Sequence, residues 1–344
     1  MRVLWMKKEH LRVFLKASKQ FGELWGPVQK GKVHVYDKID DFSELILEPT
    51  KTVLSIKKLV HPPEFNMFRY DGESYEAELE NMPRKVVYGV PPCDIHGLLI
   101  LDDLFTRYYP DPYYIKRRER TAILGVSFCT PTEGCLCKSM GTDVVEEGFD
   151  LFFSDLKDFY LVWVGSSLGD DMVRAEPDLF NDNITRKHTD KFIECKTERD
   201  EKFTRGIDMT VIPDLMELSY DIPLWNELGE RCLECGACTV VCPTCNCYNI
   251  VDEPSISGSK GDRRRYWDCC IYTEYSLVAG GHNFRRTRGE RLRLWYSHKL
   301  KSFGYSEKPA CVGCGRCIDT CPVDINVLVV ARALLGKKEH KGKS

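Results

Sequence analysis

Long hydrophobic runs are missing from this 344-residue sequence, whereas a membrane-spanning helix needs about 18 apolar residues in a row. The best candidate, Ile325–Leu335, is shorter and contains Arg332. The first residues, MRVLWMKKEHLRVFLK, carry charges throughout, whereas a secretory signal has an apolar core. We therefore expect a cytoplasmic protein with no membrane span.

The sequence also lacks the short motifs of several enzyme classes. It has no G-x-G-x-x-G after a strand, no P-loop, no H-E-x-x-H and no G-x-S-x-G. Paired C-x-x-C motifs for a nickel site, near opposite ends of the chain, are absent as well. We therefore predict no catalytic residues in this chain and no site of its own for two-electron chemistry.

Cysteine, in contrast, is abundant: the chain has 17, an odd number. Without a secretory signal, this count favours metal-bound thiolates in a reducing compartment over a disulfide framework. Two runs share the spacing C-x2-C-x2-C-x3-C-P. They are Arg231–Cys247, RCLECGACTVVCPTCNC, and residues 311–322, CVGCGRCIDTCP.

This spacing is typical of a cubane iron–sulfur site, and in two-cluster ferredoxins the fourth cysteine of each run binds the other cluster. We therefore assign the thiols to two [4Fe-4S] clusters. The first takes Cys232, Cys235, Cys238 and Cys321, and the second takes Cys311, Cys314, Cys317 and Cys242. The alternative is a zinc-stabilised interaction module, although zinc motifs space their cysteine pairs differently.

A predicted strand–helix–strand unit brings further thiols together. RKVVYGV and RTAILGVSF are expected to be parallel strands joined by the helix IHGLLILDDLF, with Asp94 as its N-cap. Cys93 and Cys129 then lie at the carboxyl ends of neighbouring strands, where open α/β sheets bind ligands, and Cys135 and Cys137 follow in FCTPTEGCLC. The pattern leaves two interpretations open: these four thiols hold a third [4Fe-4S] cluster, or Cys93 and Cys129 are buried as small apolar side chains.

Three more thiols, Cys245, Cys247 and Cys270, stand near the first run. They are candidates for a further cluster-ligand set or for redox-active thiols that reduce sulfur compounds. The simpler interpretation is packing against the clusters, with S–H groups donated to cluster sulfur. Cys195 has no partner at a suitable spacing and is expected to be structural, and His282 is interpreted as a helix cap or a hydrogen-bond partner of a cluster.

Charge is nearly balanced, with a net charge of −3, but residues 260–301 contain 11 Lys or Arg and 4 Asp or Glu. A basic groove for RNA would need interleaved aromatic residues and an RNA-binding motif, which this segment lacks. Cations beside anionic clusters offset their charge, which is the interpretation we favour, and we expect no nucleic-acid partner.

The predicted organisation has four parts. Residues 1–60 form a helix and a small sheet, with TVLSIKKLV extended. Residues 61–204 form an α/β domain with a short parallel βαβ unit. Residues 205–336 form an α-helical ferredoxin-like domain with two [4Fe-4S] clusters, and residues 337–344 are a disordered tail. The helical fold of the third part is expected because the two motifs begin 79 residues apart and SLVAGGHNFRRTRGERLRLWYSHKL between them reads as mainly helical.

From Met1 to Gly336 the sequence resembles the beta subunit of cytoplasmic [NiFe] hydrogenase/sulfhydrogenase complexes, which is related to the A subunit of anaerobic sulfite reductase. The segments that carry the resemblance are YGVPPCDIHGLLILD, SFCTPTEGCLC, GFDLFF, CLECGACTVVCPTCNCY, RRYWDCC, LVAGGHNFRRTRGERLRLWY and CVGCGRCIDTCP. The resemblance places Cys93, Cys129, Cys135 and Cys137 on family cysteines, which favours the third cluster. It also covers Cys245, Cys247 and Cys270, but Cys269 departs from the family pattern.

The resemblance implies an electron-transfer subunit between the small subunit of a hydrogenase, whose large subunit splits hydrogen, and a gamma subunit that binds flavin and NAD or NADP. Two rival functions stay open. One is the corresponding subunit of an anaerobic sulfite reductase. The other is polysulfide reduction on this chain at Cys245, Cys247 and Cys270.

Overall fold

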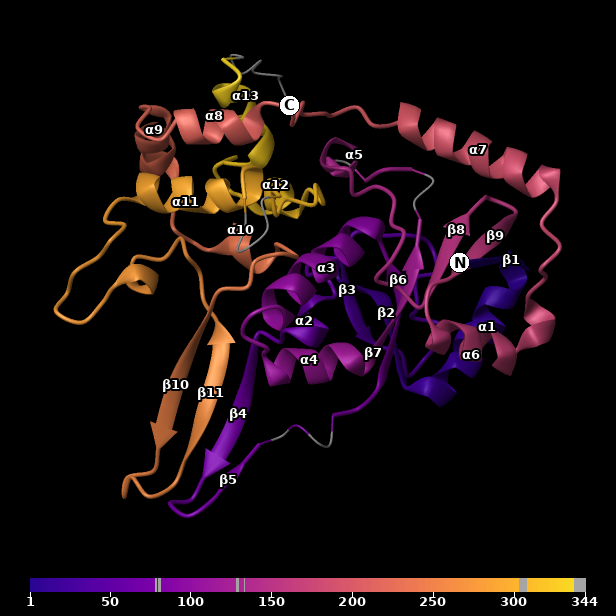
Figure 1. Ribbon diagram of the computed structural model, residues 1–344, viewed down its shortest axis with the longest axis horizontal. Coiled ribbons are helices and arrows are strands. Elements are labelled where there is room, and N and C mark those ends of the chain that lie inside the picture. Colours follow the sequence, from indigo (N-terminus) through magenta and orange to yellow (C-terminus); the bar gives the residue numbers. More distant parts are fainter. Residues whose placement is uncertain (78, 80–81, 128–129, 133, 303–307, 337–344) are drawn as a thin grey trace.

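A seven-stranded sheet forms the centre of the computed structural model, which describes residues 1–77, 79, 82–127, 130–132, 134–302 and 308–336 (Figure 1). The strand order is β1-β9-β8-β7-β6-β2-β3. Strands β2, β6, β7 and β8 are mutually parallel, whereas β1, β9 and β3 pair antiparallel with their neighbours. The bounds are β1 (Arg2–Lys7), β2 (Glu23–Lys30), β3 (Val33–Lys38), β6 (Lys85–Val90), β7 (Thr121–Val126), β8 (Leu151–Asp155) and β9 (Phe159–Val164).

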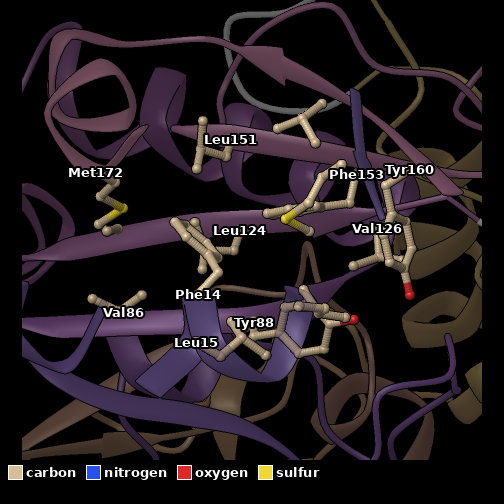
Figure 2. Close-up of a cluster of buried hydrophobic side chains, with 14 of the residues drawn as sticks. Phe14, Leu15, Val86, Tyr88, Leu124, Val126, Leu151, Phe153, Tyr160 and Met172 are labelled. Carbon is tan, nitrogen blue, oxygen red and sulfur yellow. The ribbon is translucent and has the colours of Figure 1, made fainter. Parts of the chain in front are cut away.

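Helices cover both faces of this sheet. On one face Phe14 and Met172 pack with Tyr88 of β6 in a buried apolar cluster (Figure 2). On the other face Leu98 and Phe105 pack with β6 and β7. Burial on both faces explains why these two strands are continuous apolar runs. The covering helices are α1 (Leu11–Ser18) and α6 (Ser167–Ala175) on the first face, and α2 (Lys57–Val60), α3 (Pro92–Thr106) and α4 (Pro112–Glu119) on the second.

The predicted βαβ unit is present, because β6 and β7 are parallel neighbours with α3 and α4 between them in the chain. The predicted N-cap is wrong. Pro91 is the N-cap of α3 and Pro92 occupies its first turn, where a missing N–H costs nothing. Asp94 lies further into the helix, is buried, and forms an ion pair with Arg316.

A smaller antiparallel sheet joins segments from both halves of the chain (Figure 1). Arg265 is buried there, forms an ion pair with Asp111 and places its guanidinium 3.5 Å from the ring centroid of Tyr248. The hairpin from residues 248–267 was not predicted from sequence. The order is β10-β11-β4-β5, with β4 (Glu64–Tyr70), β5 (Tyr75–Glu76), β10 (Tyr248–Pro254) and β11 (Gly261–Trp267).

A helical layer at the C-terminal side has its own core, which includes Trp225, Leu228 and Trp295. Its helices are α8 (Ile212–Leu218), α9 (Leu224–Arg231), α10 (Ala237–Val240), α11 (Arg288–Leu300), α12 (Arg316–Thr320) and α13 (Val327–Leu334). The other elements are α5 (Cys137–Met140), α7 (Arg186–Glu201), and the 3-10 turns η1 (Lys8–His10), η2 (Lys19–Phe21), η3 (Pro177–Leu179) and η4 (Glu274–Ser276). No helix in the described part of the chain is long and apolar enough to span a membrane.

Three local expectations are corrected by the structure. Residues 57–60 are helical, not extended, and the long helix expected over residues 276–300 begins only at Arg288. The strands within residues 1–60, which are β1, β2 and β3, belong to the same sheet as β6, β7, β8 and β9. They therefore do not form a small sheet of their own. The expected disordered tail, residues 337–344, lies outside the described residues.

Candidate iron–sulfur centres

The two cysteine runs form the same loop twice. In each run a glycine with positive φ precedes the third cysteine: Gly236 at +70° and Gly315 at +76°. Each glycine is the N-cap of a short helix, α10 or α12, and these two helices pack against each other. Because L-residues avoid this backbone conformation, glycine allows the chain to turn its three thiols toward one centre.

The first run lines a cavity together with a thiol from the second run. The four thiols at this first cavity are Cys232, Cys235, Cys238 and Cys321. Cys235 is exposed, whereas the other three are buried or half-buried. Burial raises the pKa of Cys232, which is the usual cost of placing a thiolate away from water.

The second cavity is lined by three thiols of the second run and one thiol of the first run. Its four thiols are Cys242, Cys311, Cys314 and Cys317. Lys299 lines this cavity, is 2% exposed, and donates to the Thr244 hydroxyl at 2.8 Å. Burial raises the pKa of Cys311 to about 12. A buried ammonium needs anionic neighbours, and four thiolates around a cluster supply that charge.

The third cavity is lined by Cys93 at the start of α3, by Cys135 in the loop before α5 and by Cys137 at the start of α5. The Cys135 and Cys137 sulfur atoms lie 2.8 Å apart, and the Cys137 thiol lowers the pKa of Cys135 to about 7 by donating to it. Cys129, the fourth predicted ligand, lies outside the described residues. The structure therefore brings together the three described members of the predicted set.

The three cavities form a row. Trp295 lines both the first and the second cavity, and Cys314 lines both the second and the third. Gly313 accepts a hydrogen bond from the Leu136 N–H at 2.7 Å, which joins the second run to the loop of the third cavity. A single layer of side chains thus separates neighbouring cavities.

The donor sets fit iron–sulfur clusters. Four thiols surround each of the first two cavities, and thiolate is the ligand that these clusters require. Among the described residues, no group of three or more His, Cys, Asp or Glu side chains is placed to hold a single metal ion.

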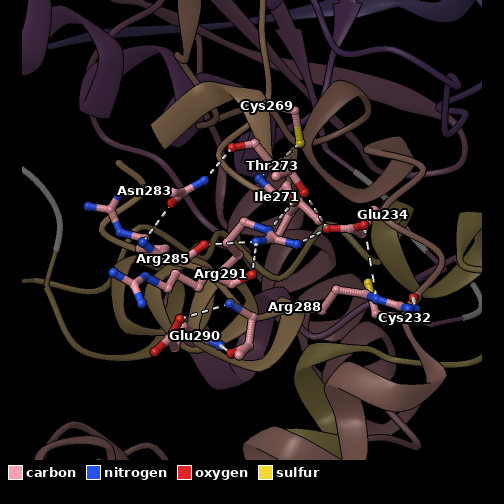
Figure 3. A network of polar contacts seen from close by, with 12 residues as sticks. Cys232, Glu234, Cys269, Ile271, Thr273, Asn283, Arg285, Arg288, Glu290 and Arg291 are labelled. Carbon is pink, nitrogen blue, oxygen red and sulfur yellow. Dashed lines mark hydrogen bonds and ion pairs between the residues drawn. The ribbon is translucent and has the colours of Figure 1, made fainter. Parts of the chain in front are cut away.

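Part of the basic segment holds the first run in place (Figure 3). Arg288 donates to the Cys232 carbonyl at 2.7 Å, and the buried Arg291 pairs with Glu234 and donates to the Ile271 carbonyl at 2.8 Å. Arg263, in contrast, pairs with Asp252 within the hairpin of the small sheet. The basic segment thus divides between supporting the cluster loops and stabilising the second sheet.

The remaining thiols near the first run form a separate group. The Cys270 thiol donates to the Cys247 sulfur and lowers the pKa of Cys247 to about 6. The Cys245 thiol likewise donates a hydrogen bond to the Cys242 sulfur and lowers the pKa of Cys242. Lys57, which is 3% exposed, donates to the Cys245 carbonyl at 3.0 Å and lies 3.9 Å from the ring centroid of Trp267. None of the three cavities described above is lined by Cys245, Cys247 or Cys270.

The other candidates from the sequence have simpler surroundings. Cys269 accepts hydrogen bonds from the Thr239 hydroxyl at 3.0 Å and the Ile271 N–H at 3.3 Å. Cys195 is buried with Leu156 and Leu161 in a small apolar cluster. His282 is exposed and lies against the ring of Phe284, and the N-cap of the next α-helix, α11, is Thr287.

Sequence reasoning missed the buried charges beside the cavities. Thiols lie close to each of these buried charges, which are Lys57, Lys299 and the Asp94–Arg316 pair. The only available signal was position, because Asp94 directly follows Cys93 and Arg316 lies between Cys314 and Cys317.

Comparison with known proteins defines the class and then the family. A family model described as a 4Fe-4S dicluster domain matches residues 231–325, which contain both cysteine runs, so the chain is an iron–sulfur protein with such a domain. It is also 37% identical over 328 residues to sulfhydrogenase 2 subunit beta of Pyrococcus furiosus, a match that covers 94% of this chain and 96% of that protein. The chain therefore belongs to the sulfhydrogenase beta-subunit family, which confirms the prediction made from its motifs.

Proposed function

We propose that the chain is the electron-transfer subunit of a cytoplasmic, multisubunit [NiFe] hydrogenase of the sulfhydrogenase type. It connects the hydrogenase small subunit with a gamma subunit that binds flavin and NAD or NADP. The observation that carries this proposal is the row of three thiol-lined cavities with shared walls. Bound there, [4Fe-4S] clusters supply one-electron transfer between the two partners.

The chain's own cysteines hold the sites. We assign the first cluster to Cys232, Cys235, Cys238 and Cys321, the second to Cys242, Cys311, Cys314 and Cys317, and a third to Cys93, Cys129, Cys135 and Cys137. The order along the row is first, second, third, because the second cavity shares a wall with each of the others. The exposure of Cys235 supports the approach of a partner at the first site.

Iron and acid-labile sulfide per chain test the proposal after anaerobic purification, together with low-temperature EPR of the dithionite-reduced protein. About 12 iron per chain supports three clusters. About 8 supports the two motif clusters alone and removes the third site. Cys93→Ser should lower the iron content by about 4, whereas the matched variant Cys195→Ser should not change it. Zinc without iron would refute the proposal.

A second candidate function, reduction of polysulfide on this chain, is favoured by one observation. Cys245, Cys247 and Cys270 lie beside two buried lysines, Lys57 and Lys299, whose charges suit an anionic substrate. A Cys247 thiolate would attack polysulfide, break an S–S bond, form a persulfide and release the shortened polysulfide. Two electrons from the partner hydrogenase and one proton would then cleave the persulfide, returning the thiolate and releasing HS−.

The variant Cys270→Ser distinguishes polysulfide reduction from electron transfer. If the thiol group reduces polysulfide, this variant loses turnover of polysulfide by the isolated chain with a chemical reductant, while the EPR signals of the motif clusters persist. Cys195→Ser, which changes a buried thiol elsewhere, keeps full turnover. Unchanged turnover in Cys270→Ser would leave electron transfer as the sole function.

A further inference from the structure

A buried ion pair lies at the third cavity, and its arginine stands in the chain between two thiols of the second cavity. The Asp94 side chain is fully buried and the Arg316 side chain is 3% exposed. Two hydrogen bonds join them, at 2.5 Å and 2.8 Å, in a parallel arrangement of guanidinium and carboxylate. Such bidentate pairs are the strongest charge-assisted contacts between side chains.

Each partner is attached to a different cluster site. Asp94 directly follows Cys93 in α3, and Arg316 begins α12 between Cys314 and Cys317. Arg316 lines the third cavity together with Cys93 and Cys314. The pair therefore spans 222 residues of sequence and fixes the two thiol loops relative to each other.

The hydrogen bonds of the guanidinium go to Asp94 and Thr52, and its charge also acts on the Cys93 and Cys314 thiols. Besides Asp94, Arg316 donates to the Thr52 carbonyl at 2.8 Å and to the Thr52 hydroxyl at 3.3 Å. Arginine remains protonated in proteins, so this site carries a permanent positive charge. In a buried position that charge acts over a longer range than in water, and Asp94 is the carboxylate paired with it.

We propose that the Asp94–Arg316 pair is a charge-compensated link between two cluster sites. Arg316 anchors the second-site loop to α3, and Asp94 cancels the positive charge that would otherwise raise the reduction potential of clusters on both sides. Reduction adds negative charge to a cluster, so an uncompensated cation nearby favours the reduced state. This inference rests on the proposed function, and both residues are positioning residues.

The test is a redox titration followed by EPR on the full-length chain, in its complex where it assembles. Asp94→Asn keeps the size of the side chain but removes its charge, and should shift two of the cluster midpoint potentials to more positive values. The first site, behind Trp295, should keep its potential. The double variant Asp94→Asn with Arg316→Gln removes both charges and should restore potentials near those of the wild type.

A matched control separates charge from folding. Asp111→Asn breaks another buried arginine pair, Arg265–Asp111, and neither of these residues lines any of the three cavities. It should lower stability and leave every potential unchanged. If Asp94→Asn fails to assemble its clusters, the double variant alone tests the proposal. Its cluster potentials must then equal those of the wild type.

The outcomes distinguish this proposal from the one on which it rests. A wild-type chain without iron–sulfur clusters would refute the electron-transfer function itself. Clusters that are present, but whose potentials do not move in Asp94→Asn or do move in the double variant, would overturn the role of the pair and leave the electron-transfer function intact.

Discussion

At the scale of single residues, buried charges lie close to the half-buried thiols of the second cavity. Lys299 lines the second cavity and lies close to Cys242 and Cys311. We expect Lys299→Met to lower the midpoint potential of the second cluster by about 60 mV, which corresponds to about 1.4 kcal/mol for one electron. Lys301→Met, two residues further on and 37% exposed, is the control and should leave the potential unchanged. EPR-monitored titration measures both, and equal shifts in the two variants would contradict the prediction.

A second residue-scale prediction concerns pH. Burial, assisted by Arg265 and Lys57, lowers the pKa of His61 to about 2, and its Nε2 has no hydrogen-bond partner among the described residues. The unfolded chain binds this proton near pH 6.5, so folding stability falls as the pH drops below 6.5, by about 1.4 kcal/mol per pH unit from this group.

Denaturant unfolding of the anaerobic protein at several pH values checks this loss. His61→Leu should remove that part of the pH dependence, because no histidine then remains to be protonated at this position. His282→Leu, at an exposed site, is the control and should keep the wild-type dependence. A His61→Leu protein that loses stability in acid as steeply as the wild type would contradict the assignment.

These residues also mark the limit of sequence reasoning. The thiols of the first two cavities were predictable because a repeated local spacing determines which cysteines face one centre. Asp94 was misassigned as an N-cap, since its partner Arg316 is 222 positions away and no local pattern connects them. Buried lysines such as Lys57 are equally invisible, because only the packed structure places them near thiols.

At the scale of elements, strongly patterned segments were predicted and weakly patterned ones were not. The strands β6 and β7 are continuous apolar runs and were found. The β10–β11 hairpin is polar, with β10 largely exposed and β11 half-buried, so its strands have no apolar alternation to detect. The short α2 was predicted to be extended because brief apolar runs do not distinguish a helix from a strand.

The contact between the loops of the second and third cavities depends on one glycine. Gly313 has φ of +64°, and a Cβ there would overlap the backbone of Leu136 and Cys137. We expect Gly313→Ala to displace the third-site loop and to lower the iron content by about 4 per chain. Gly258→Ala, at φ of +73° with open space around it, carries the same backbone strain of about 1–2 kcal/mol and should keep its iron. Equal iron in both variants would contradict this packing role.

At the scale of the whole molecule, two halves of the chain meet at the cluster sites. α3 belongs to the sheet domain, α12 belongs to the helical layer, and both border the third cavity. Gly97 of α3 also lies directly against Pro243 of the first cysteine run. The sheet domain therefore contributes to the wall of the row of cavities.

The row predicts that the middle site is indispensable for transfer from one partner to the other. Cys317→Ser removes a thiol that borders the second cavity and neither of the others. In the assembled complex we expect hydrogen-dependent reduction of NAD or NADP to fall by at least tenfold, because removing the middle site lengthens the distance that an electron must cross. Hydrogen-dependent reduction of a viologen dye, which takes electrons before they enter this chain, should persist. Cys195→Ser should leave both activities at the wild-type level. If Cys317→Ser loses the middle cluster by EPR and still reduces the nicotinamide at the wild-type rate, electrons do not pass along this row, and the first and third sites serve separate partners.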